Sequence, residues 1–145
     1  MRIYIKILFI SVIGAQNIPY FDGDLAFSHL VKQCDFGARY PGSKAHENLK
    51  DYFVEFLSTR ADEVIVDDHK IKHPYSDHNI SLYNIVAKYN IEAKDRILLL
   101  AHWDTREIAD KDEKIENQHK PIIGANDGAS GIAILMSLSQ ILYDF

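Results

Sequence analysis

The chain has 145 residues, about the length of one domain, of which 47% are hydrophobic and 26% are charged. This composition is ordinary for a globular protein and excludes a disordered chain, which lacks the apolar side chains needed for a core. The formal net charge is -5 and no basic cluster stands out, so we expect no nucleic-acid partner.

The first residues match the pattern of a secretory signal peptide. A basic start with Arg2 and Lys6 precedes an apolar run over residues 7–14, and small residues close that run. The run is too short to cross a bilayer, which takes about 20 residues, so no stable membrane insertion is expected. We therefore predict a signal peptide over residues 1–15 and an exported, periplasmic or secreted, chain over residues 16–145. A buried N-terminal strand is the alternative.

Two helices are predicted next in the chain. Residues 22–33 have apolar side chains at helical spacing, and a loop rich in glycine and proline follows over residues 36–43. Ser43 can cap the second helix. In that helix the apolar residues fall at i, i+3, i+4, i+7 and i+8, a stripe that faces a core: Leu49, Tyr52, Phe53, Phe56 and Leu57.

Strand patterns then alternate with polar connections. Residues 63–70 and 82–89 read as strands, with a polar loop or hairpin connection over residues 73–81. Residues 97–101 are a continuous apolar run, as expected for a strand that is covered on both faces. After a long polar loop over residues 106–120 we predict a final helix that is apolar all round, and therefore buried, over residues 128–143.

Side chains that could bind a metal or take part in catalysis lie between the last predicted strand and the final helix. His102 and Asp104 follow the strand directly, and an extended backbone puts both on one side, where the carboxylate can orient the imidazole ring. Asp127 lies in a glycine-rich segment at the predicted helix start, where a carboxylate could cap the helix or hold a metal. Ligands commonly bind beyond the carboxyl ends of strands in open α/β sheets.

Each of these signals has a simple structural explanation when taken alone. A His-x-Asp triplet arises by chance, an aspartate before a helix is most often only a cap, and spaced glycines form turns. Their occurrence together, at the end of an apolar strand and the start of an apolar helix, favours a metal site.

The same segments resemble the family of zinc aminopeptidases and glutaminyl cyclases, and in particular its bacterial glutaminyl-peptide cyclotransferases. The specific matches are HWDTR at residues 102–106 and GANDGASG at residues 124–131; CDFGARYPGS at residues 34–43 and NIVA at residues 84–87 support them. The sequence departs from the family at residues 107–108, where relatives have a proline and an aromatic residue, which puts the conformation of that loop in question.

The resemblance implies roles for particular residues. Asp127 matches the family's zinc-binding aspartate, and His102 matches the histidine that binds the second zinc in two-metal members but is no ligand in single-zinc cyclases. Asp104 matches the carboxylate that orients the site, and we assign it to the catalytic residues. The family also uses glutamate and histidine residues much later in the chain than residue 145. We therefore expect the 145 residues to be incomplete and inactive alone.

The implied fold is an α/β three-layer sandwich with a mixed central sheet, of which this chain would hold the first half. The implied function is a zinc-dependent glutaminyl-peptide cyclotransferase acting on peptide or protein N-termini. A two-zinc aminopeptidase and a non-catalytic relative or binding module remain the alternatives.

Overall fold

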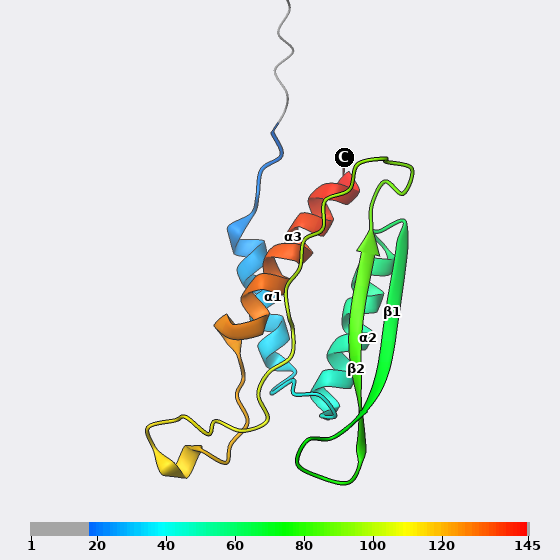
Figure 1. Ribbon diagram of the computed structural model, residues 1–145. Helices are drawn as coiled ribbons and strands as arrows, with labels where there is room; N and C mark the ends of the chain where they lie inside the picture. The colour runs from blue at the N-terminus through cyan, green and yellow to red at the C-terminus, as the bar shows by residue number, and fades with distance from the viewer. Residues whose placement is uncertain (1–17, 145) are drawn as a thin grey trace, which may run out of the picture.

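The computed structural model describes residues 18–144, and the predicted signal peptide lies outside them (Figure 1). Within residues 18–144, no helix has both the length and the apolar character needed to cross a membrane. The elements are, in chain order, α1 (Gly23–Asp35), α2 (Lys44–Ser58), β1 (Glu63–Lys72), β2 (Asn79–Lys88), the short helix η1 (Ile115–Asn117), the turn η2 (Ala125–Ala129) and α3 (Ser130–Asp144).

The first two helices begin where side-chain caps satisfy their exposed backbone amides. Asp22 Oδ1 accepts a hydrogen bond from the Leu25 amide at 2.9 Å, and Ser43 Oγ accepts one from the His46 amide at 3.1 Å. Both predicted helices are confirmed, with α1 ending two residues later than expected.

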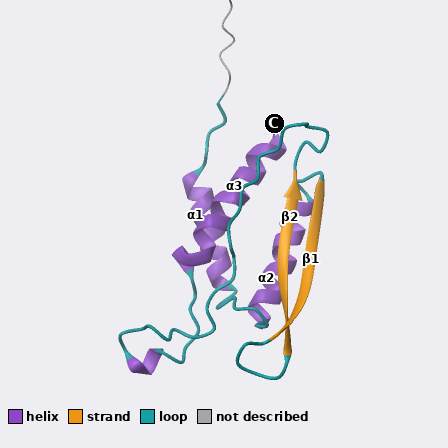
Figure 2. Ribbon diagram, in the orientation of Figure 1, coloured by secondary structure: helices purple, strands orange, loops and turns teal. Residues whose placement is uncertain are grey.

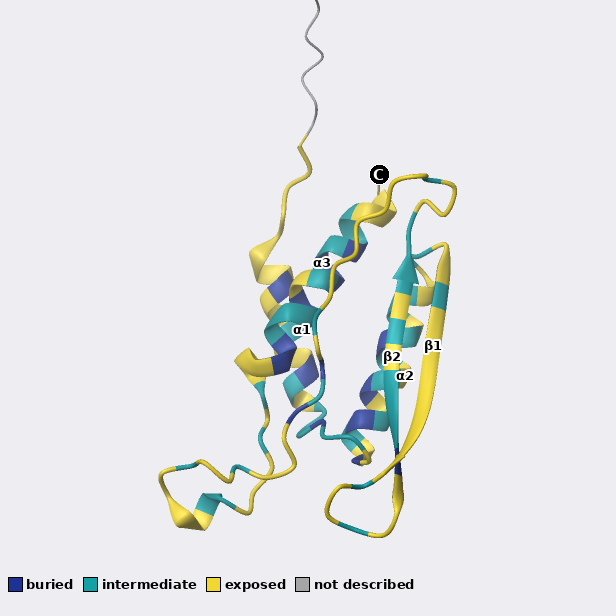
Figure 3. Ribbon diagram, in the orientation of Figure 1, coloured by how far each residue is buried: buried dark blue, intermediate teal, exposed yellow. Residues whose placement is uncertain are grey.

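The two predicted strands form an antiparallel hairpin. Their register pairs Glu63 with Lys88 and Lys72 with Asn79. α2 lies against this hairpin and contacts both strands, whereas α1 and α3 pack against each other (Figure 2). The apolar core lies between these layers, as the buried faces of the helices show (Figure 3), and its buried members are Leu49, Phe53, Trp103 and Met136.

The prediction of a covered strand over residues 97–101 is wrong for the described chain. This segment runs without strand assignment between α3 and β2 (Figure 2), and the exposed fractions of Leu98 and Leu100 are 75% and 80%. An apolar run becomes a sheet strand only when a neighbouring strand satisfies its backbone groups. Among residues 18–144 the sheet consists of β1 and β2 alone, so the segment is extended but unpaired.

The final helix also departs from its prediction in two respects. α3 begins at Ser130 instead of residue 128, because Asp127 and Gly128 have non-helical backbone angles. It is not buried all round: the exposed fractions of Ile134 and Leu142 are 49% and 50%. α1 covers one side of α3, so the apolar residues on its other sides keep contact with solvent.

Candidate functional site

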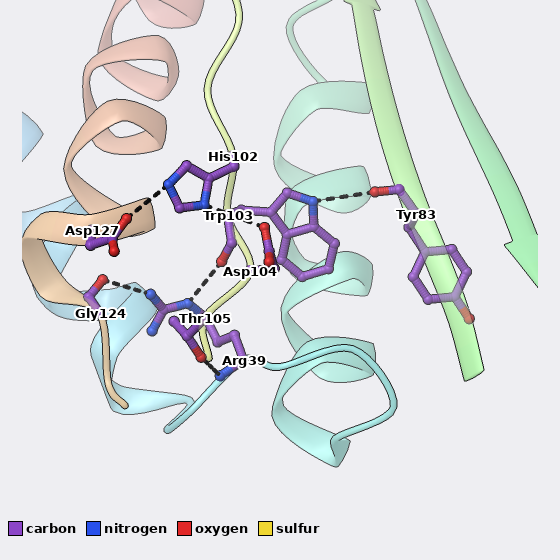
Figure 4. A network of polar contacts seen from close by, with 8 residues as sticks. All are labelled: Arg39, Tyr83, His102, Trp103, Asp104, Thr105, Gly124 and Asp127. Atoms are coloured by element: carbon purple, nitrogen blue, oxygen red, sulfur yellow. Dashed lines mark hydrogen bonds and ion pairs between the residues drawn. The ribbon is translucent and has the colours of Figure 1, made fainter. Parts of the chain in front are cut away.

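The predicted site residues His102, Asp104 and Asp127 lie together, where the segment after residue 101 meets the turn before α3 (Figure 4). His102 Nε2 is 3.0 Å from Asp127 Oδ1, and His102 Nδ1 is 3.3 Å from Asp104 Oδ1. The imidazole ring therefore bridges two carboxylates that are 23 residues apart in sequence, since 127 − 104 = 23. The side chains of His102 and Asp127 are 57% and 79% exposed, so a ligand can reach both.

The turn η2 carries Asp127 to this position with the help of two glycines of positive φ, one just before the turn and one within it. Gly124 has a φ of 62° and Gly128 a φ of 102°, values that residues other than glycine rarely adopt. A Cβ atom on Gly128 would lie 2.9 Å from the Asp104 carbonyl oxygen, so the two backbones touch here. Asp127 lies three residues before the start of α3, and its Oδ1 is directed at His102 Nε2.

Trp103 anchors the segment that carries His102 and Asp104. Its ring is stacked on the buried His46 with centroids 4.1 Å apart, and it meets Phe53 edge-on at 5.6 Å. The indole nitrogen donates to the Tyr83 carbonyl at 3.4 Å. With Trp103 held in the core, the alternation of an extended backbone directs its two neighbours to the other side, toward Asp127. Burial lowers the pKa of His46, which favours the neutral form of this stacked ring.

Sequence reasoning missed Arg39, whose side chain is fully buried beside the site. The guanidinium donates from Nε to the Trp103 carbonyl at 3.2 Å and from Nη2 to the Gly124 carbonyl at 2.9 Å (Figure 4). Arg39 lies within the segment of residues 34–43 that resembles the family, but nothing in its composition or spacing indicates a buried position.

The donor atoms at this site are of the types that zinc binds in proteins. Imidazole nitrogen and carboxylate oxygen are common zinc ligands. A zinc-binding histidine usually donates a hydrogen bond from its other ring N–H to a carboxylate, as His102 Nδ1 can to Asp104. His102 and Asp127 therefore fit a zinc ion. Within residues 18–144, no cluster of three or more His, Cys, Asp and Glu side chains is arranged to hold a metal.

Comparison with known proteins identifies the relatives of this chain. Residues 84–144, which include β2, the site segment and α3, match the model of peptidase family M28. The chain is 38% identical to the leucine aminopeptidase precursor of Bacteroides thetaiotaomicron, with a TM-score of 0.82, and the match covers 88% of this chain and 44% of that structure.

Two further solved structures are similar to this chain. The glutaminyl cyclase of Tannerella forsythia is 35% identical, with a TM-score of 0.82 over 87% of this chain and 43% of that one. A Zn-dependent exopeptidase of Parabacteroides distasonis is 29% identical, with a TM-score of 0.81 over 87% of this chain and 43% of that one. The chain thus spans less than half the length of the structures it matches.

These matches confirm the predicted α/β fold class and the predicted resemblance. The motif residues that carry the resemblance in the sequence lie together in space, in a fold shared with a glutaminyl cyclase and a Zn-dependent exopeptidase. The chain is accordingly related to peptidase family M28 and has the fold of part of its zinc-dependent glutaminyl cyclases and exopeptidases.

Proposed function

We propose that the complete protein is a zinc-dependent glutaminyl-peptide cyclotransferase, which converts the N-terminal glutamine of a peptide to pyroglutamate and releases ammonia. The observation that carries the proposal is the chain of contacts from Asp104 through His102 to Asp127, at 3.3 and 3.0 Å. The similarity to the Tannerella forsythia glutaminyl cyclase supports the same reading.

Each of the three side chains has a distinct role in this proposal. Asp127 provides a carboxylate oxygen to the zinc ion, because it is the most exposed of the three and lies on the tightly constrained turn. His102 holds Asp127 in place through Nε2, and Asp104 fixes the orientation of the ring through Nδ1. When bound, zinc supplies a Lewis acid that polarises the side-chain amide carbonyl of the substrate glutamine.

The second candidate is a two-zinc aminopeptidase, and one feature of His102 favours it. If the Nδ1–H group donates a hydrogen bond to Asp104, Nε2 keeps a lone pair that points toward Asp127, 3.0 Å away. A neutral imidazole nitrogen beside a carboxylate is a suitable pair of ligands for a metal. The similarity to the leucine aminopeptidase precursor of Bacteroides thetaiotaomicron agrees with this alternative.

The first experiment tests Asp127 as a zinc ligand in the complete protein. We expect Asp127→Ala to abolish zinc-dependent activity on N-terminal glutamine peptides and to lower bound zinc in metal analysis, because one ligand oxygen is lost. The matched control is Asp77→Ala, since Asp77 is a fully exposed aspartate in the hairpin connection. Full activity and unchanged zinc in Asp127→Ala would show that the ligand assignment is wrong.

Zinc stoichiometry in the same preparations separates the two candidate functions. A cyclase should contain one zinc per chain in the wild type. At saturating zinc His102→Ala should still bind one zinc, although more weakly, because His102 orients a ligand and is not itself one. An aminopeptidase should contain two zinc ions and lose one of them in this variant. Two zinc ions in the wild type, with one lost in His102→Ala, would replace the cyclase proposal by the aminopeptidase.

A further inference from the structure

Arg39 is a buried cation that lies between the segments carrying the proposed metal-site residues. Its exposed fraction is 0%, and its hydrogen bonds run to backbone carbonyls on both sides of the site. Nε donates to the Trp103 carbonyl at 3.2 Å, Nη2 donates to the Gly124 carbonyl at 2.9 Å, and Nη1 donates to the Ile123 carbonyl at 2.7 Å. Nη1 also reaches carbonyls of its own loop and of α1, those of Gly37 and Gln33.

The positions of these acceptors relate Arg39 directly to the site. Trp103 is the residue between His102 and Asp104, and Gly124 directly precedes the turn η2 that carries Asp127 (Figure 4). A single planar guanidinium therefore joins two backbone segments. One carries His102 and the other carries Asp127, and these two side chains are 3.0 Å apart.

The main chain of Arg39 also forms hydrogen bonds to Thr105, in the segment that carries His102 and Asp104. The Arg39 amide donates to Thr105 Oγ1 at 2.8 Å, and the Thr105 amide donates to the Arg39 carbonyl at 3.3 Å. Packing around Gly124 is equally close, because a Cβ there would lie 2.5 Å from Thr105 Cγ2 and 3.5 Å from Arg39 Nη2. Arg39, Thr105 and Gly124 thus form one tightly packed unit beneath the site.

Burying a charged arginine at this position is costly, and its hydrogen-bonding geometry explains why arginine is present. Burial lowers the pKa of Arg39, which means that desolvation opposes the charged form, while the nearby Asp104 carboxylate favours it. The acceptors are carbonyl dipoles spread over separate segments, and a guanidinium offers donors in a fixed plane that can reach them together. A lysine has the same charge, but its one ammonium nitrogen cannot occupy the separate positions from which Nε, Nη1 and Nη2 of Arg39 donate.

We propose that Arg39 is a positioning residue that sets the separation of His102 and Asp104 from Asp127, and thereby the zinc affinity of the site. This inference rests on the proposed zinc-dependent function. Removal of a group that orients metal ligands commonly reduces metal affinity by about 10- to 100-fold. Arg39→Lys keeps the charge and loses the planar fork, and a loss of zinc affinity in this range is the expected result.

The experiment compares Arg39→Lys with Arg60→Lys in the complete protein. Arg60 is the matched control, because its guanidinium also joins distant elements, from Phe56 at the end of α2 to Gln140 in α3, but away from the site. Zinc affinity is measured by competition with a chromophoric chelator, and stability is measured by urea unfolding of the metal-free proteins. Arg39→Lys should bind zinc at least tenfold more weakly than the wild type, and Arg60→Lys should bind it equally well.

A second variant covers the case in which Arg39→Lys does not fold. Thr105→Val keeps the size of the side chain but removes the hydroxyl that accepts from the Arg39 amide, and it should also weaken zinc binding. Zinc affinity that stays at the wild-type level in the folded Arg39 variant, or in Thr105→Val if only that one folds, overturns the inference. Equal losses in the Arg39 and Arg60 variants overturn it too. A wild-type protein that binds no zinc refutes the proposed function itself.

Discussion

Gly128 shows how much of the site depends on the absence of a side chain. It follows Asp127 and has a φ of 102°, in a region that favours glycine. An added Cβ would lie 2.9 Å from the Asp104 carbonyl oxygen and 3.4 Å from His102 Cε1. The turn η2 can therefore approach the His102 segment only with glycine at this position.

We expect Gly128→Ala to destabilise the protein by about 1–3 kcal/mol, the usual cost of a residue held in a disfavoured backbone region. The added methyl group also pushes the turn away from His102, so zinc affinity should fall as well. Urea unfolding and chelator competition measure the two effects. Gly23→Ala is the control, since a Cβ there meets nothing within 4 Å and its φ is not positive. Equal stability of the two variants would contradict the close contact at Gly128.

At the scale of elements, the loop after the site is tied to the β1–β2 hairpin. Glu107 Oε2 lies 3.1 Å from His73 Nε2, and the ring of His73 stacks on that of His78 with centroids 4.8 Å apart. The side chain of His73 is only 10% exposed, although it lies in the polar connection between the two strands. The family resemblance put the conformation of the loop at residues 107–108 in question, and in the structure Glu107 contacts His73.

Loss of this contact should loosen the loop over residues 106–120. We expect Glu107→Ala to accelerate trypsin cleavage at the loop lysines by up to about fivefold, the effect of a surface pair contributing at most about 1 kcal/mol. Initial cleavage rates at Lys111, Lys114 and Lys120 can be followed by mass spectrometry. Asp77→Ala removes a different ion pair, with Lys72 in β1, and should leave these rates unchanged. Equal rates in wild type and Glu107→Ala would show that the contact does not hold the loop.

The elements differ in how far the sequence alone could predict them. Local chemistry determined α1, α2 and the hairpin, because caps such as Ser43 and the apolar periodicity act within a few residues. The apolar pattern of residues 97–101 predicted a covered strand, but pairing depends on neighbours that a local pattern does not contain. The start of α3 shifted for a related reason: the backbone contact of Gly128 with Asp104 prevails over the local tendency to begin a helix.

The sequence predicted the residues of the candidate site but not the buried residue that holds their backbone segments in place. The spacing of His102 and Asp104 indicated a shared side, and the glycine-rich segment indicated a turn around Asp127; both groups lie together in the structure. Arg39 could not be found this way, because its acceptors are main-chain carbonyls, which every residue has and no sequence pattern marks.

At the scale of the whole molecule, a broad apolar groove of about 820 Å³ lies between β2, residues 97–104 and α3. The side chains of residues 97–100 are exposed, and their backbone is not paired in the sheet of the described chain. An extended apolar segment with unpaired backbone is a template for association with other chains. This side of the molecule is therefore expected to associate with other chains.

We expect the 145-residue chain, expressed by itself, to self-associate through residues 97–100. The double variant Leu98→Lys with Leu100→Lys should shift it toward monomer, because two charges on an extended apolar edge oppose strand pairing. Tyr75→Lys with Ile115→Lys is the control: it adds the same charge at apolar side chains of similar exposure, 84% and 76%, outside the groove. Light scattering after size-exclusion chromatography gives the mass of each species. A monomeric wild-type chain, or equal relief by both double variants, would contradict association through this segment.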